Sequence, residues 1–116
     1  MSASGDEVTC EELKKMLAND KVTIIDVRNP EELEKGTIQG SVNIPVNNVK
    51  EALSLDPKSF ESRFGRQKPR LDAPVIFHCQ LGWRGANATG MAREMGYSRA
   101  QNLKGGFGEW DSHTAQ

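Results

Sequence analysis

One short segment of the chain combines a cysteine, a glycine and an arginine in an order that suits anion chemistry. Cys79 is followed by Gly82 and Arg84, directly after the strand-like run at 74–78. The glycine lets the backbone curl so that successive N–H groups point at one centre. The arginine adds a fixed positive charge and a forked set of donors. Such surroundings favour thiolate over thiol, so the segment predicts a nucleophilic sulfur that faces a negatively charged group.

The elements that must position this segment alternate between strand and helix patterns. Short apolar or β-branched runs predict strands at 7–8, 22–26, 41–44, 74–78 and 100–103. Capping residues, apolar stripes and glycine stops predict helices after Thr9 and Asn29, at 84–95, around Trp110, and a short one that carries Phe60 and Phe64. This alternation indicates an α/β fold, a parallel sheet with helices on both faces. Ligands bind at the carboxyl ends of strands in such sheets, which is where Cys79 is expected.

The first predicted helix carries two informative patterns. Thr9 and Glu12 have the spacing of a capping box, and the helix is expected to end at 19–20. Cys10 falls on the apolar stripe of this helix, which favours a buried structural thiol over a redox partner for Cys79.

The composition is that of one ordinary globular domain. With 116 residues, 36% hydrophobic and 27% charged, the chain fits a single domain over 1–116 with a core at about 7–112. The 15 basic and 16 acidic residues argue against nucleic-acid binding. No apolar run approaches the ~20 residues of a membrane span. Two cysteines cannot build a disulfide scaffold, and the first residues show no signal-peptide pattern, so a reducing, cytoplasmic location is expected.

Four blocks of the sequence together resemble the single-domain rhodaneses, the thiosulfate sulfurtransferases. The segment 79–84 is similar to their Cys-x-x-Gly-x-Arg active-site loop. The segment 24–28 resembles the Asp-x-Arg end of a family strand, and 36–45 resembles the segment that closes with Asn-Ile-Pro. Leu-x-Gly-Gly at 103–106, followed by Trp110, resembles the family's ending. The chain is most similar to small thiosulfate sulfurtransferase/rhodanese-like domain proteins.

The resemblance implies a fold, a reaction and a set of site residues. The fold is a rhodanese-like, doubly wound parallel sheet of about five strands. The Cys79 thiolate would take the sulfane sulfur of thiosulfate or a related persulfide, and would pass it from a Cys79 persulfide to a thiol such as glutathione or thioredoxin, or to cyanide. Neither a cofactor nor a metal is implied. Asp26 and Arg28 would support the loop, and Arg84 would hold the sulfonate. The implied substrate-binding residues are Gln80, Leu81, Gly82, Trp83 and Arg84.

The sequence departs from the family pattern at three positions. Thr37 replaces a common histidine, which concerns packing more than chemistry. Gln80 replaces a frequent arginine, so the site carries less positive charge. Trp83 stands where a small or basic residue is common, and an aromatic side chain there offers a contact for a partner. The basic segment 63–70 is read as a solvated face, with partner docking as the alternative.

Two other functions remain open at this point. His78 and Cys79 together match the start of the cysteine-phosphatase loop, which is also used by arsenate reductases. That loop has five residues between cysteine and arginine, whereas four separate Cys79 from Arg84. A noncatalytic binding or regulatory module on the same fold is the other alternative. His78 is read as a strand residue, and Asp26 with Arg28 as an ion pair that braces the loop.

Overall fold

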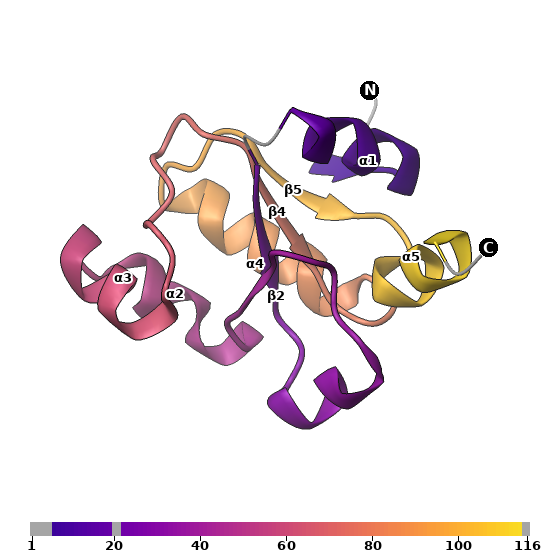
Figure 1. Ribbon diagram of the computed structural model, residues 1–116. Coiled ribbons are helices and arrows are strands. Elements are labelled where there is room, and N and C mark those ends of the chain that lie inside the picture. Colours follow the sequence, from indigo (N-terminus) through magenta and orange to yellow (C-terminus); the bar gives the residue numbers. More distant parts are fainter. Residues whose placement is uncertain (1–5, 20–21, 115–116) are drawn as a thin grey trace.

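The chain forms a five-stranded parallel sheet covered by helices on both faces (Figure 1). The structure is a computed structural model that describes residues 6–19 and 22–114. The strands lie in the order β1-β5-β4-β2-β3. Their bounds are β1 Glu7–Val8, β2 Thr23–Asp26, β3 Val42–Asn43, β4 Val75–His78 and β5 Ala100–Leu103. The predicted α/β fold, a doubly wound sheet of about five strands, is therefore confirmed. The first residues, on which the signal-peptide reading rests, and Asp20 at the expected helix end lie outside the described residues.

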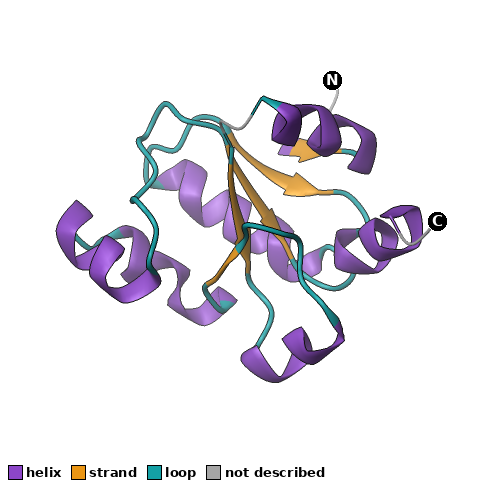
Figure 2. Ribbon diagram, viewed as in Figure 1, coloured by secondary structure: helices purple, strands orange, loops and turns teal. Residues whose placement is uncertain are grey.

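The helices divide between the two faces of the sheet (Figure 2). Residues of α2, α3 and α4 pack into one apolar cluster with the sheet, and residues of α1 and α5 pack into the other. The bounds are α1 Cys10–Ala18, η2 Pro30–Lys35, η3 Val46–Asn48, α2 Val49–Leu53, α3 Pro57–Phe64, α4 Trp83–Glu94 and α5 Gly106–Thr114; η2 and η3 are 3₁₀-helices.

The central strand β4 shows why the strands read as continuous apolar runs. Val75 and Phe77 belong to the cluster beneath α4, whereas Ile76 belongs to the cluster beneath α1 and α5. Successive side chains of a strand point to opposite faces. A strand that is covered on both faces therefore needs apolar side chains on both, as Val75, Ile76 and Phe77 provide. Full burial of such side chains stabilises the fold by about 1.5–3 kcal/mol each. The same alternation sends Cys79, the residue after β4, toward the α4 side.

The capping box at the start of α1 is present. The Glu12 N–H donates to Thr9 Oγ1 over 3.1 Å, and the Thr9 N–H donates to Glu12 Oε1 over 2.8 Å. Cys10 is buried in the cluster between α1, α5 and the sheet, and this burial raises the pKa of its thiol. The interpretation of Cys10 as a structural core residue is confirmed by this position.

Three segments differ from the sequence-based expectations in detail. The helix expected after Asn29 is a short 3₁₀-helix that ends at Gly36, where φ is 124°. The expected strand 41–44 shortens to Val42–Asn43, and Pro45 caps the 3₁₀-helix that follows. The weakly patterned segment 47–73 contains more helix than the one predicted, because α2 and η3 precede α3. Phe60 and Phe64 do anchor α3, with ring centroids 4.8 Å apart.

Candidate active site

The Cys79 sulfur lies in a loop between the carboxyl end of β4 and the start of α4. The Gly82 N–H donates to Sγ over 3.0 Å, and the Gly85 N–H donates over 3.3 Å. Gly82 has φ of 124°, a conformation that side-chain-bearing residues rarely adopt, and it caps α4. The helix N-terminus therefore directs two backbone donors at one sulfur, which is the arrangement that stabilises a thiolate.

The buried cysteine borders an open hollow on the surface. Only 1% of Cys79 is exposed, yet it lines a hollow of about 500 Å³. The other lining residues come from the same loop, from the start of α4 and from η2: Glu32, Gln80, Leu81, Trp83 and Arg84. Two of them project into solvent, since Leu81 is 74% exposed and Trp83 is 83% exposed. A small donor can thus reach a sulfur that the loop otherwise shields.

Asp26 and Arg28 form a buried brace beneath the loop. The Arg28 Nη2 lies 2.7 Å from Asp26 Oδ2, and Arg28 Nε donates to Asp26 Oδ1 over 3.0 Å. The same guanidinium donates to Gln80 Oε1 over 3.1 Å and to the Gly36 carbonyl over 3.0 Å, and it lies 4.4 Å above the Phe107 ring. The end of β2, the cysteine loop, the end of η2 and α5 are thereby tied together. The prediction that Asp26 and Arg28 brace the loop as an ion pair is confirmed.

The residues of the cysteine loop that were predicted to bind substrate differ in where they point. Gln80 lines the hollow, but its amide oxygen is engaged by Arg28 and is turned toward the brace. Leu81 and Trp83 form exposed apolar walls, as the sequence suggests for Trp83. Gly82 contributes its backbone N–H to the sulfur.

Arg84 has a partner that the sequence does not reveal. Its Nη1 donates to Glu32 Oε1 over 2.6 Å and its Nη2 donates to Glu32 Oε2 over 2.9 Å, an end-on bidentate pair between residues 52 positions apart. This bidentate bond lowers the pKa of Glu32 to about 2 and raises that of Arg84, to which Cys79 also contributes. The prediction that Arg84 holds the sulfonate stays a prediction, and in the structure its guanidinium is bound to Glu32.

The start of α5 supports the loop from below, a role that the sequence analysis missed. The Phe107 N–H donates to the Cys79 carbonyl over 2.7 Å, and the Gly108 N–H donates to the Gln80 carbonyl over 3.1 Å. A Cβ at Gly106 would lie 2.5 Å from the Cys79 carbonyl oxygen, so only glycine permits this approach. The paired glycines at 105–106 are the sequence signal of this close packing.

Asn102 at the end of β5 is a second supporting residue that sequence reasoning missed. Its Nδ2 donates to the Gly82 carbonyl over 3.2 Å, and its Oδ1 would lie 2.2 Å from a Cβ at Gly85. Both glycines whose N–H groups reach the sulfur are thus held against one side chain. An asparagine in a strand of mixed character gave no signal of this role.

His78 and Cys10 lie away from the hollow. His78 is a fully buried strand residue whose Nε2 lies 3.7 Å from Asp26 Oδ2 and whose ring stacks on Phe107. Burial lowers its pKa, so the ring is neutral at pH 7. It has the position of a packed strand residue, as predicted, and does not line the hollow beside the sulfur.

The basic segment 63–70 forms local interactions. Arg66 donates to the Gly40 carbonyl, Lys68 donates to the Leu55 carbonyl over 2.7 Å, and Arg63 lies 3.6 Å from Glu51. The arginines of this segment are exposed, as the reading of a solvated face predicts.

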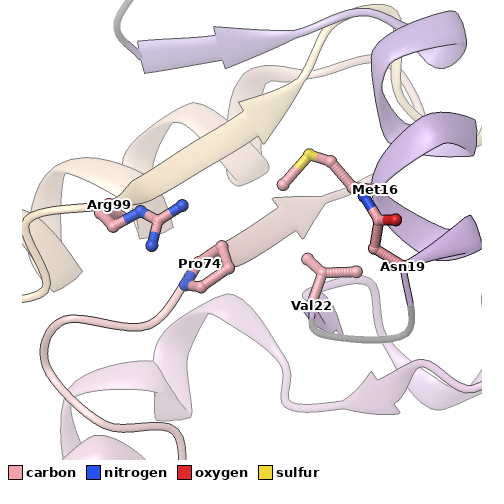
Figure 3. Close-up of a pocket in the computed structure, with 5 residues that line it drawn as sticks. All are labelled: Met16, Asn19, Val22, Pro74 and Arg99. Atoms are coloured by element: carbon pink, nitrogen blue, oxygen red, sulfur yellow. The ribbon is translucent and has the colours of Figure 1, made fainter.

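Another hollow of about 500 Å³ lies at the amino ends of the strands (Figure 3). It is lined by Met16, Asn19, Val22, Pro74 and Arg99. Pro74 and Val22 precede β4 and β2, so this hollow is at the edge of the sheet opposite to Cys79. None of these five described lining residues carries a nucleophilic side chain, and the cysteine loop remains the candidate site.

Metal sites and membrane-spanning helices can be assessed for residues 6–19 and 22–114. Within these ranges, no group of three or more His, Cys, Asp or Glu side chains could hold a metal ion. None of the described helices has the length and apolar character needed to cross a bilayer.

Comparisons with known proteins find relatives of this chain in both sequence and fold. The chain is 40% identical over 109 residues to the thiosulfate:glutathione sulfurtransferase of Homo sapiens, which covers 93% of this chain and 95% of that protein. It is 34% identical to the protein of the same name from Saccharomyces cerevisiae, over 89% of this chain and 76% of that one. The solved structure of a human single-domain sulfurtransferase superposes with a TM-score of 0.87 at 39% identity, over 91% of this chain and 95% of that one.

The family model described as the rhodanese-like domain matches residues 9–113, which include every element that positions the Cys79 sulfur. The resemblance first read from four sequence blocks thus extends over nearly the whole chain, and the protein belongs to the rhodanese-like domain family.

Proposed function

We propose that this protein is a sulfurtransferase that moves the sulfane sulfur of thiosulfate or a related persulfide to a thiol through a persulfide on Cys79. The observation that carries the proposal is the Cys79 sulfur itself, which accepts two backbone N–H bonds and borders an open hollow. Relatives that are 40% and 34% identical over most of the chain are thiosulfate:glutathione sulfurtransferases, which supports the same reaction here.

In the first half-reaction, the Cys79 thiolate attacks the outer sulfur of thiosulfate. A bond forms between Cys79 Sγ and that sulfur, and the bond from the outer sulfur to the sulfonate breaks. The electron pair of the broken bond leaves with sulfite, so no oxidant or reductant is needed. In its thiolate form, Cys79 attacks without the help of a general base. The Gly82 and Gly85 N–H groups stabilise the negative sulfur before and after attack.

In the second half-reaction, an acceptor removes the sulfur and restores the thiolate. Glutathione is the proposed acceptor, because the two relatives compared above carry it in their names. Its thiol gives a glutathione persulfide, and cyanide gives thiocyanate in the same way. Thioredoxin is proposed as a second thiol acceptor on the strength of the family resemblance alone. The two half-reactions make the mechanism a ping-pong cycle.

The other two functions receive no support from particular observations. The loop between Cys79 and Arg84 has four residues, one fewer than the phosphatase loop, and Arg84 is bound to Glu32. A noncatalytic module has no need of a cysteine that lies at a helix N-terminus, accepts two N–H bonds and borders a hollow.

Mass spectrometry of the intact protein tests the proposal. After incubation with thiosulfate and removal of the excess, we expect the protein to be one sulfur atom heavier, and cyanide to reverse the gain. Cys79→Ser should abolish both the gain and the turnover. Cys10→Ser is the matched control, because the other thiol is buried on the opposite face of the sheet, and it should leave both nearly unchanged.

A folded protein that gains no sulfur at Cys79 would contradict the proposal. Full turnover by Cys79→Ser would also contradict it.

A further inference from the structure

Apart from the Cys79 sulfur, two charged residues line the hollow, and their charges cancel. Arg84 is the cation and Glu32 is the anion. Both terminal nitrogens of Arg84 are bound to the two Glu32 oxygens, at 2.6 Å and 2.9 Å. A donor that enters the hollow therefore meets a neutral pair whose strongest donor groups are already occupied.

Glu32 is also fixed from its own side. The Asn29 N–H donates to Glu32 Oε1 over 2.9 Å, and the Glu32 N–H donates to the Asn29 carbonyl over 2.9 Å. The carboxylate thus closes the start of η2 while it holds the arginine. Its pKa of about 2 means that it keeps its negative charge throughout the neutral range. At neutral pH, protonation does not remove the charge of Glu32. Rotation of its side chain would break the cap at the start of η2.

The remaining walls do not replace the missing positive charge. Leu81 and Trp83 are apolar and exposed, and the Gln80 amide oxygen is held by Arg28. Arg28 itself is fully buried against Asp26. Thiosulfate carries two negative charges, so it must approach a fixed carboxylate or displace it from Arg84, and both cost free energy.

We propose that Glu32 is a specificity-determining residue that disfavours dianionic thiosulfate and favours organic persulfides as sulfur donors. The inference rests on the proposed sulfur-transfer function. An organic persulfide, R–S–SH, brings no sulfonate, and its organic group can lie against Leu81 and Trp83. The Cys79 thiolate attacks the terminal sulfur, the S–S bond of the donor breaks, and the products are Cys79–S–SH and the thiolate R–S⁻. Atoms, charge and electrons balance without a further reactant.

The test compares two donors on the wild-type protein and on Glu32→Gln. Glutamine keeps an oxygen that can accept from Asn29 and Arg84, so it removes the charge with little change of shape. The rate constant for sulfur gain at Cys79 is measured by rapid quench and mass spectrometry, with thiosulfate or with cysteine persulfide. We expect Glu32→Gln to raise the ratio of the thiosulfate rate constant to the cysteine persulfide rate constant about tenfold.

Glu34→Gln is the matched control, because it removes the same charge from an exposed position of the same 3₁₀-helix. It should change neither rate constant by more than about twofold. A second measurement needs no variant: added salt should raise the thiosulfate rate constant of the wild-type protein, and the salt dependence should be weaker in Glu32→Gln.

Three results would overturn the inference. The thiosulfate rate constant could fall in Glu32→Gln, which would make Glu32 a residue that only positions Arg84. The rate constants for both donors could change by the same factor. If the wild-type protein takes sulfur from neither donor, both the proposed function and this inference fail. If sulfur is transferred but the ratio of the two rate constants is the same in Glu32→Gln as in the wild-type protein, only the inference is rejected.

Discussion

Two arginine–carboxylate pairs lie next to the cysteine loop. They have the same charged groups but differ in burial and in the number of further partners. The pair of Arg28 and Asp26 is fully buried, and the arginine also binds the Gln80 side chain and the Gly36 carbonyl. In the pair of Arg84 and Glu32, both side chains are about a third exposed, at 32% and 30%. The buried pair has the properties of a structural brace, whereas the exposed pair can exchange one partner for a ligand. Water access, more than residue type, separates the two roles.

Removing the buried arginine should have the largest effect on stability. Arg28→Ala leaves the Asp26 carboxylate buried without its cation, and loss of one partner from such a pair costs about 3–5 kcal/mol. We expect that loss in the free energy of unfolding, measured by urea denaturation. The control is Arg70→Ala, because Arg70 also pairs with an aspartate two residues away, at a fully solvated position. It should cost less than about 1 kcal/mol. Equal losses in the two variants would contradict the distinction between brace and surface pair.

Removing the arginine at the hollow should affect catalysis more than stability. Arg84→Ala breaks a partly exposed pair, so we expect the free energy of unfolding to fall by no more than about 1 kcal/mol. The Glu32 carboxylate then lacks its cation beside the incoming donor, and kcat/KM for thiosulfate should fall about tenfold. Steady-state assays with cyanide as acceptor measure this effect. An unfolded variant would show that Arg84 is a structural residue like Arg28. A variant as active as the wild-type protein would show that Arg84 has no role in the site.

The smallest expected effect is the pH dependence of the exposed pair. The bond from Arg84 lowers the pKa of Glu32 from 4.5 to about 2, so the unfolded state takes up the proton first as the pH falls. The stabilisation is therefore complete above about pH 4.5 and is lost between that value and pH 2. Because the pair is partly exposed, the amount should stay below about 1 kcal/mol.

Urea denaturation of the wild-type protein and of Glu32→Gln at several pH values measures this loss. The difference between their free energies of unfolding should shrink across that interval. A difference that stays constant down to pH 2 would mean that the pair adds no stability.

The same comparison explains which parts of the site could be predicted from sequence. Asp26 and Arg28 are two residues apart at the end of a clear strand, so a local pattern was enough to predict their brace. The nucleophile was likewise signalled by β4, Gly82 and the spacing to Arg84. The partner of Arg84 was not predictable, because it lies 52 positions away in a different segment. Contacts between distant segments require the fold.

The contacts that support the cysteine loop from α5 and β5 also could not be predicted from local sequence. The glycines at 105–106 were recognised as part of the family resemblance, which does not reveal the close approach of Gly106 to Cys79 and Gln80. Asn102 gave no signal, because its role depends on the register that places β5 beside β4. The strands and most helices were predictable from local periodicity, whereas the short 3₁₀-helices and the extra helix of 47–73 depend on tertiary packing.

The dependence of the cysteine loop on α5 has a consequence for biosynthesis. The amides of Phe107 and Gly108 that hold the loop belong to the last helix of the described chain. During translation, the ribosome must release this helix before the sulfur can acquire its finished surroundings. A nascent polypeptide therefore lacks these two hydrogen bonds to the cysteine loop for most of its synthesis, until the domain is complete.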